Sequence, residues 1–319
     1  MPNPQPATAE SIQRAARILR DGDLVAFPTE TVYGLGANAL DADAIERIYR
    51  AKGRPRSSPL IAHVDSVEQA QSLLAAWPED AQKLADAFWP GPLTLVLPKA
   101  AQVPDALTGG LGWLGVRQPA HPVALELIRA TGQPLAAPSA NPFMQLSPTT
   151  AEHVARGMGD AVGMILDGGA CAFGIESTVV RIKPGETQLL RPGAIPRLLI
   201  EQVLGHAVVD AQVPTDDVHA SPGQHPRHYA PRTPLMLAQT GQRLPPGRGA
   251  LLAIDAPFPP PACDLIRMPA GAEQYARQLY AELHRLDDAG YDWIAVQTPP
   301  ALPDWAAVHD RLQRAAHPA

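Results

Sequence analysis

The chain has 319 residues, 45% of them hydrophobic, and its 26 basic against 32 acidic residues give a net charge of −6. This length exceeds the roughly 100 to 200 residues of a usual single domain, so we expect one large and one small domain with a sizeable core. The negative charge disfavours a protein whose whole surface binds nucleic acid.

Targeting signals are also missing from the sequence. The N-terminal residues contain no apolar segment, and no apolar run approaches the roughly 18 residues of a membrane span. Cys171 and Cys263 are too few for a disulfide framework and are expected to be free thiols in a reducing compartment. The sequence therefore predicts a cytoplasmic protein with neither signal peptide nor membrane helix.

The first elements surround a loop rich in hydroxyl groups. A helix is predicted from a cap at Thr8 or Ser11 to Gly22, followed by a strand at 24–27. Residues 28–36 then read PTETVYGLG. Hydroxyls at Thr29 and Thr31, with glycines that let a backbone approach closely, predict a loop that binds a small ligand. The alternative is an ordinary strand-to-helix turn.

A basic cluster closes the next predicted helix, at 41–49. It consists of Arg47, Arg50, Lys52, Arg54 and Arg56, and Lys52 stands out because only 4 of the 26 basic residues are lysines. The structural alternative for this cluster is a cationic helix end that suits the helix dipole.

Alternating strands and helices continue to about residue 205. Strands are predicted at 60–64, 93–97, 114–117, 134–137, 162–166, 178–182 and 188–191, and helices at 67–74, 80–88, 122–130, 150–158 and 196–204. Helices mixed with direct strand-to-strand links predict an α/β domain, at 1–205, with a twisted mixed sheet.

The pattern changes after Gly205. Residues 206–234 hold few apolar positions and several prolines, which indicates an extended linker. Strands are predicted beyond it at 235–238, 250–254 and 293–297, with helices at 272–286 and 305–315. We therefore expect a smaller Rossmann-like α/β domain at 235–319.

Several familiar motifs fail in their context. Gly110-Leu-Gly112-Trp-Leu-Gly115 fits GxGxxG but runs into a predicted strand, and the chain has no GxxxxGK[ST] phosphate loop. Ser139 lacks the glycines of GxSxG. His219, His225 and His228 lack nearby cysteines or a helical histidine pair, so no metal site is expected and a solvated linker is favoured.

The remaining motifs form one ordered series. After the loop at 28–36 come Lys52-Gly-Arg-Pro, Pro59-Leu60, His63, Trp89-Pro-Gly-Pro-Leu-Thr, Gly115-Val-Arg117, Ala137-Pro-Ser139-Ala-Asn141, Ser147-Pro-Thr-Thr, Glu176-Ser177-Thr178-Val179-Val180 and Leu190-Arg191-Pro192-Gly193. In this order they resemble the YrdC-type L-threonylcarbamoyladenylate synthases, from about Ser11 onward. Residues 221–231, SPGQHPRHYAP, resemble the linker of that family's long two-domain branch.

The resemblance implies a nucleotidyltransferase. Its substrates would be L-threonine, bicarbonate or CO₂, and ATP with Mg²⁺, and its products threonylcarbamoyl-AMP and pyrophosphate. The product would pass to the tRNA threonylcarbamoyl-transferase complex for N6-threonylcarbamoyladenosine at tRNA position 37, with weak direct tRNA binding. A motif set rich in cations and poor in nucleophiles agrees with catalysis by charge neutralisation.

The resemblance also implies residue roles. Lys52 and Arg54 would neutralise the ATP phosphates and act in catalysis, and Arg117 would hold the threonine carboxylate in a bidentate fork. Threonine would contact Thr31, His63, Arg117, Ala137 and Ser177. ATP would contact Lys52, Arg54, Ser58, Ser139, Asn141, Ser147 and Arg191, with Tyr229 of the linker closing over it.

Three positions depart from the family pattern. Trp113 stands where the family usually has a threonine, which puts a hydroxyl contact to ATP in doubt, although a backbone or stacking contact would replace it. Ser58 stands where asparagine is common, and His225 where lysine is common.

Two other functions stay open from the residues. The basic cluster at 47–56 would suit a tRNA- or double-stranded RNA-binding module, but the net charge and the lack of RNP or GXXG patterns oppose it. Carbamoyl transfer in hydrogenase maturation needs an acylphosphatase segment and cysteine-rich zinc fingers, which two cysteines cannot supply.

Overall fold

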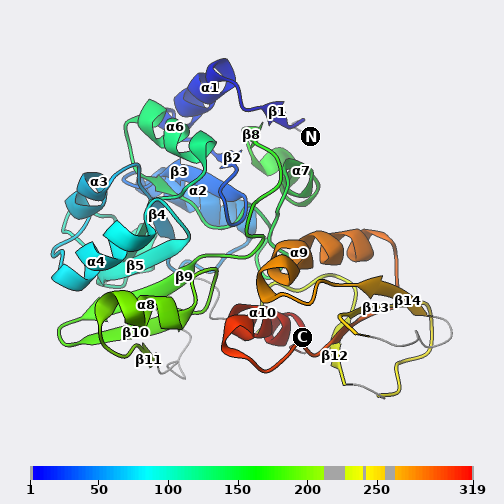
Figure 1. Ribbon diagram of the computed structural model, residues 1–319. Coiled ribbons are helices and arrows are strands. Elements are labelled where there is room, and N and C mark those ends of the chain that lie inside the picture. The colour runs from blue at the N-terminus through cyan, green and yellow to red at the C-terminus, as the bar shows by residue number, and fades with distance from the viewer. Residues whose placement is uncertain (1–2, 212–226, 240–241, 256–262, 318–319) are drawn as a thin grey trace.

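The computed structural model describes residues 3–211, 227–239, 242–255 and 263–317. It contains a large domain built on an 11-stranded sheet and a small domain built on a 4-stranded sheet (Figure 1). This confirms the predicted α/β class with a mixed sheet and two domains. No described helix is both long and apolar enough to cross a membrane.

The large sheet has the strand order β1-β8-β2-β3-β7-β4-β6-β5-β9-β10-β11 and mixes parallel with antiparallel pairs. Its strands are β1 (Gln5–Pro6), β2 (Val25–Phe27), β3 (Gly34–Asn38), β4 (Ile61–His63), β5 (Leu93–Pro98), β6 (Trp113–Arg117), β7 (Leu135–Ala136), β8 (Met164–Asp167), β9 (Thr178–Lys183), β10 (Glu186–Arg191) and β11 (Val209–Asp210). Its helices are α1 (Ala9–Arg20), α2 (Ala42–Lys52), α3 (Val67–Ser72), α4 (Glu79–Phe88), α5 (Asp105–Thr108), α6 (Pro122–Thr131), α7 (Ala151–Met158) and α8 (Arg197–Leu204), with a 3-10 turn at Gly159–Ala161.

Helices cover both faces of the large sheet, and the strand side chains alternate between them. Val25 and Phe27 of β2 pack in one apolar cluster with α1 and α6, whereas Ala26 packs in the other with α2, α4, α7 and α8. The first helix starts at Thr8, whose side chain caps the amide of Ser11, and this confirms the predicted cap.

Strand β3 corrects the interpretation of residues 28–36 as one loop. The glycines of that motif belong to β3, which pairs antiparallel with β2. A Cβ on Gly36 would lie 2.8 Å from Cε1 of Phe27, so glycine is needed there for packing and not for approach to a ligand. Only residues 28–33 form the loop.

The small domain is an all-parallel sheet of order β12-β15-β13-β14. Its elements are β12 (Leu235–Ala238), β13 (Gly249–Ala253), β14 (Cys263–Arg267), α9 (Ala272–Asp288), β15 (Trp293–Gln297), a 3-10 turn at Pro303–Trp305 and α10 (Ala306–Ala315). Helices α9 and α10 lie between this sheet and the large domain (Figure 1). The core of the small domain includes Val32, Leu146 and Ile175 of the large domain, so one apolar cluster spans both domains.

Besides β3, four further helices and strands were missed from the sequence. β1 and β11 have two residues each and α5 is a single turn, too short for a periodic pattern. β14 is half-exposed and has no clear alternation. All four lie at an edge of a sheet or in a connection, so the predicted architecture was unaffected.

Candidate active site

The site is a cavity of about 50 Å³ in the large domain, room for a ligand of only a few atoms. Its walls come from loops and strand ends that lie far apart in the sequence. They are lined by Thr29, Thr31, Val32, Gly34, Arg54, Ile61, His63, Arg117, Ala137, Pro138, Ser139, Glu176, Ser177, Arg191, His228 and Tyr229. The structure thus brings together nine of the thirteen predicted site residues, all except Lys52, Ser58, Asn141 and Ser147.

Sheet register explains why His63 and Arg117 meet. They are the last residues of the parallel neighbours β4 and β6 and pair directly with each other. Burial, together with the nearby Arg117 charge, lowers the pKa of His63 to about 3. His63 is therefore neutral at physiological pH, and its buried Nδ1 has no hydrogen-bond partner among the described residues.

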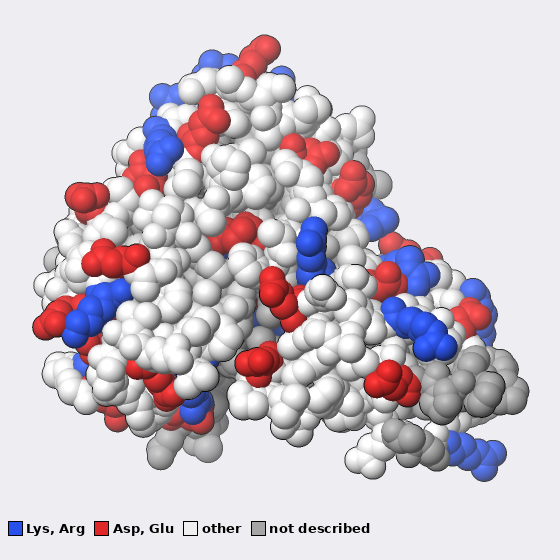
Figure 2. Space-filling view, in the orientation of Figure 1, with Lys and Arg blue, Asp and Glu red and all other residues white. Residues whose placement is uncertain are grey.

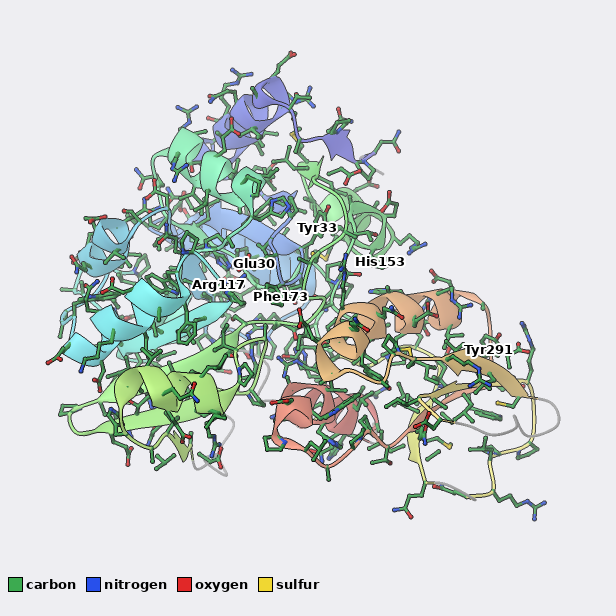
Figure 3. All side chains as sticks on the ribbon, in the orientation of Figure 1. Glu30, Tyr33, Arg117, His153, Phe173 and Tyr291 are labelled. Atoms are coloured by element: carbon green, nitrogen blue, oxygen red, sulfur yellow. The ribbon has the colours of Figure 1, made fainter. Side chains whose placement is uncertain are left out.

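Arg117 is held by three groups before any ligand arrives. Its Nε donates to the carbonyl of Gly91 at 3.2 Å and its Nη1 to Oγ1 of Thr31 at 3.0 Å. Its Nη2 lies 2.6 Å from Oε1 of Glu30 in a buried ion pair. Figure 3 shows these two side chains together in the middle of the large domain. The guanidinium is fixed in place, and its charge is shared with Glu30.

The two threonines of the loop have different tasks. The hydroxyl of Thr29 accepts hydrogen bonds from the amides of Thr31 and Val32 and donates one to the carbonyl of Val32. These bonds fix the shape of the turn. The hydroxyl of Thr31 lies between Thr29 and Arg117 at the cavity wall. Thr31 is the better placed of the two for contact with a ligand.

Lys52 and Arg54 differ from the rest of their basic cluster because they are buried, at 4% and 7% exposure. Arg54 lines the cavity, and its Nη2 donates to the carbonyl of Pro59 at 3.1 Å. Burial and the neighbouring Arg54 hold the pKa of Lys52 well below its usual value. Two buried cations side by side make this wall suitable for an anion.

Lys52 lies behind the cavity wall. Its Nζ donates to the carbonyl of Ser139, at 2.6 Å, and to that of Asn141. Asn141 itself donates to the carbonyls of Pro142 and Gln145. The carbonyl of Ser58 accepts from Tyr49 and Arg54 at the same end of α2. Lys52 therefore fixes the loop that presents Ser139 to the cavity.

A further part of the wall is formed by the residues at the start of β9 and the end of β10. Arg191 donates from Nε and Nη2 to the carbonyl of Ser177, and from Nη2 to its Oγ at 3.2 Å. A Cβ on Gly193 would lie 2.3 Å from the amide nitrogen of Thr178, so only glycine lets the two segments approach this closely. Next to them Glu176 accepts a short hydrogen bond from Ser147.

Residues 227–231, which we call the cover segment, close the cavity. His228 and Tyr229 are 5% and 1% exposed, so the expectation of a solvated linker is wrong at this point. The amide of Ala230 donates to the carbonyl of Met144 in the large domain, and the amide of His228 to that of Arg314 in α10. The hydroxyl of Tyr229 is buried without a hydrogen-bond partner among the described residues. Tyr229 thus lines the cavity, and its predicted closure over ATP stays a prediction.

Two of the three departures from the family pattern, Trp113 and Ser58, are not among the lining residues of the cavity. Trp113 packs with Val96, Val179 and Leu190, and Arg181 lies over its ring at 5.7 Å. His219 and His225 lie outside the described residues. The segment Gly110–Gly115, which fits GxGxxG, leads into β6 and not into a helix, as predicted.

Several residues of the site had no clear signal in the sequence. Glu30, Glu176 and His228 lie inside motifs already quoted, but nothing showed that their side chains would point inward. Arg311 and Tyr280 come from the small domain, and each contacts Glu176. The one signal available for these two was their position on the apolar stripes of α9 and α10.

The face of the molecule drawn in Figure 2 shows no large patch of a single charge. Acidic and basic residues are interspersed over the face in Figure 2. Within the basic cluster, Arg47 is exposed and pairs with Asp23, and Arg56 is exposed and pairs with Glu46. Positive charge does gather in the cavity, where Arg54, Arg117 and Arg191 converge.

Comparison with known proteins identifies the family. The model described as "Telomere recombination" matches residues 17–193, and the model described as "Threonylcarbamoyl-AMP synthase, C-terminal domain" matches residues 195–317. A threonylcarbamoyl-AMP synthase of Pyrococcus abyssi is 41% identical, over 96% of this chain and 94% of that protein. A threonylcarbamoyl-AMP synthase of Bacillus subtilis is 40% identical, over 96% of this chain and 92% of that protein.

A solved structure agrees with these matches. The crystal structure of P. abyssi Sua5 complexed with L-threonine has a TM-score of 0.88 and 39% identity, and the match covers 96% of this chain and 94% of that chain. The chain is thus similar to these synthases over 96% of its length, which includes both domains and the cation-lined cavity. The chain belongs to the Sua5/YrdC family of threonylcarbamoyl-AMP synthases.

Proposed function

We propose that this protein is an L-threonylcarbamoyladenylate synthase that serves N6-threonylcarbamoyladenosine formation at tRNA position 37. The observation that carries the proposal is the convergence of Arg54, Arg117 and Arg191 with the hydroxyls of Thr31 and Ser177 in one buried cavity. Such a site gathers anionic substrates and can neutralise the charge that develops in the transition state.

The reaction proceeds in two parts. The threonine amine and bicarbonate give a carbamate and water, and a carbamate oxygen then attacks the α-phosphorus of ATP as pyrophosphate leaves. The cavity would first hold threonine, with its carboxylate on Arg117 and its remaining groups near Thr31, His63, Ala137 and Ser177. Arg117 is pre-oriented by Glu30 and Thr31, which reduces the ordering needed on binding.

The phosphates would lie against the other cations. Arg54 and Arg191 would neutralise the charge that develops on the leaving pyrophosphate. Lys52 would support them by holding Ser139 and Asn141, and contacts of ATP with Ser58 and Ser147 would require the nucleotide to reach beyond the present cavity. Their arrangement favours an ATP site beside the threonine site.

Magnesium would enter with ATP and neutralise part of its phosphate charge. The residues present offer it little, because Glu30 and Glu176 are each paired with an arginine. Among the described residues no three His, Cys, Asp or Glu side chains are grouped as ligands. We therefore assign the ion to the triphosphate and derive no step from it.

The cavity is too small for ATP in this conformation, since pockets for ligands of that size measure about 300 Å³ or more. His228 and Tyr229 occupy part of its wall. We propose that the cover segment withdraws to admit ATP and returns to exclude water. The division into residues 1–205, 206–234 and 235–319 then separates a catalytic domain, a linker with an active-site lid, and a small domain.

The wider setting follows from the product. An acyl adenylate is reactive, so a cytoplasmic tRNA threonylcarbamoyl-transferase complex would accept it directly, and weak tRNA binding near the site would assist. The alternative function as an RNA-binding module is disfavoured, because two of the five cluster cations are buried and two others are paired with acids.

The test is pyrophosphate release by the purified full-length protein. We expect release from ATP with magnesium only when both threonine and bicarbonate are present, because the carbamate is the nucleophile. Omission of threonine is the matched control. Release that is indifferent to threonine would contradict the proposal.

A further inference from the structure

The small domain contacts the wall of the active site from behind, through a residue that does not itself line the cavity. Arg311, on α10, is 1% exposed although it belongs to a residue type that rarely lies fully buried. Its Nε donates to Oε2 of Glu176 at 2.7 Å, across the domain boundary. Its Nη1 donates to the carbonyl of Pro192 at 3.1 Å and to Asp310. Arg311 therefore connects α10 with the segments that precede β9 and follow β10.

Glu176 is a wall residue whose carboxylate needs this partner. It lines the cavity next to Ser177 and is 6% exposed. Burial alone raises the pKa of Glu176, and the charges of Arg311 and then Arg191 outweigh burial and hold that pKa below its usual value. Tyr280 of α9 adds a hydrogen bond to Oε2 at 3.2 Å. Removal of one partner from a buried pair leaves an uncompensated charge, which is strongly unfavourable.

Arg311 also supports the cover segment. Its guanidinium carbon lies 4.9 Å from the ring centroid of Tyr229, a cation–π contact. Tyr229 has φ of 59°, in the left-handed region that a tyrosine rarely adopts, so surrounding contacts must maintain this conformation. One side chain of the small domain thus contacts both Glu176 and the residue that closes the cavity.

We propose that Arg311 is a positioning residue of the ATP site: it neutralises Glu176 and holds Tyr229, so that docking of the small domain completes the phosphate wall. This inference rests on the proposed function, because it takes the Arg54 and Arg191 side of the cavity as the phosphate side. With Arg311 removed, the carboxylate of Glu176 would repel the triphosphate and Tyr229 would lose its stacking partner. Threonine, held on Arg117 at the other side, would be little affected.

The test is direct binding by the full-length protein, measured by calorimetry with magnesium β,γ-methylene-ATP and separately with L-threonine. Arg311→Met should raise the Kd of the ATP analogue at least about tenfold and leave the Kd of threonine within about threefold. Arg311→Met combined with Glu176→Gln should restore most of the affinity, since it removes both charges. Arg285→Ala, a charge loss at an exposed position of α9 where the side chain pairs with Glu282, is the matched control and should bind like the wild type.

Arg311→Lys keeps the inference testable if the methionine variant does not fold. It retains the charge but loses the planar contact with Tyr229, so the Kd of the ATP analogue should rise about threefold or more while that of threonine stays unchanged. Folded Arg311 variants that bind the ATP analogue like the wild type, or lose both ligands equally, would overturn the role of Arg311. A wild type that binds neither ligand would instead contradict the proposed function.

Discussion

Nη2 of Arg117 lies 2.6 Å from Oε1 of Glu30, and both side chains are almost completely buried. The carboxylate keeps the guanidinium in one orientation, and it compensates a charge that would otherwise be costly inside the protein. A ligand carboxylate that binds Arg117 therefore joins an existing ion pair, and geometry matters more than charge alone.

Substitution of Arg117 should separate the two substrates. Arg117→Lys keeps the charge but loses the fork, so the KM for threonine should rise much more than the KM for ATP. Glu30→Gln should also change the threonine KM first, because it leaves Arg117 without its buried partner. Steady-state kinetics with each substrate varied will check this. An equal change in both KM values would place Arg117 outside the threonine site.

Lys52 should matter although it lies behind the wall. Lys52→Met removes both bonds to the carbonyls of Ser139 and Asn141, so turnover should fall at least about tenfold, or about 1.4 kcal/mol of transition-state stabilisation. Arg50→Ala, at an exposed position of the same helix, should leave turnover unchanged. Near-normal turnover of a folded Lys52→Met protein would mean that its charge only suits the helix end.

The cover segment should respond to ligands. Threonine and an ATP analogue bound together should protect the bonds around Tyr229 from limited proteolysis, since a closed lid excludes solvent. Deletion of residues 222–230 should abolish adenylation while circular dichroism shows folded domains. If the deletion variant retains full activity, or if ligands leave the cleavage rate unchanged, the segment is only a tether.

Gly36 offers a stability test of the β2–β3 contact. Gly36→Ala would place a methyl group against the ring of Phe27, and overpacking of this kind costs about 1 to 3 kcal/mol of unfolding free energy. Gly112→Ala, where a Cβ meets no atom within 4 Å, is the matched control. Urea unfolding of both variants will measure the difference. Equal stabilities would show that the ring moves aside at little cost.

A stacked histidine pair at the domain boundary predicts a pH effect. The ring centroids of His153 and His284 lie 3.9 Å apart. Burial, and after it the charge of His284, lowers the pKa of His153 to about 3. The pKa of His284 is also lowered, chiefly by burial. The unfolded chain binds protons below about pH 6.5, so stability is full above that pH and falls toward pH 3.

The double variant His153→Asn with His284→Asn provides the comparison. Each titrating histidine contributes a slope of up to about 1.4 kcal/mol per pH unit in this window, less for a partly exposed ring. Between pH 7.5 and 5.5 the wild type should lose more unfolding free energy than the double variant, as measured by urea titration. The same loss in both proteins would rule out the pair as its source.

Prediction from sequence succeeded where a pattern repeats or a motif is local. The apolar spacing of Ile12, Ala15 and Leu19 predicted α1, and short apolar runs between turn residues predicted most central strands. It failed where the cause is distant in the chain. Nothing around Arg311 shows that it meets Glu176, 135 residues away, or that Gly36 makes room for Phe27.

The cover segment is anchored to both domains, through Met144 on one side and Arg314 on the other. Linkage then requires reciprocity: if close contact between the domains strengthens ligand binding, bound ligand must strengthen that contact by the same free energy. A saturating substrate should therefore raise the melting temperature of the small domain, which lines little of the cavity itself. In such a protein the thermal stability of one domain reports the occupancy of the other.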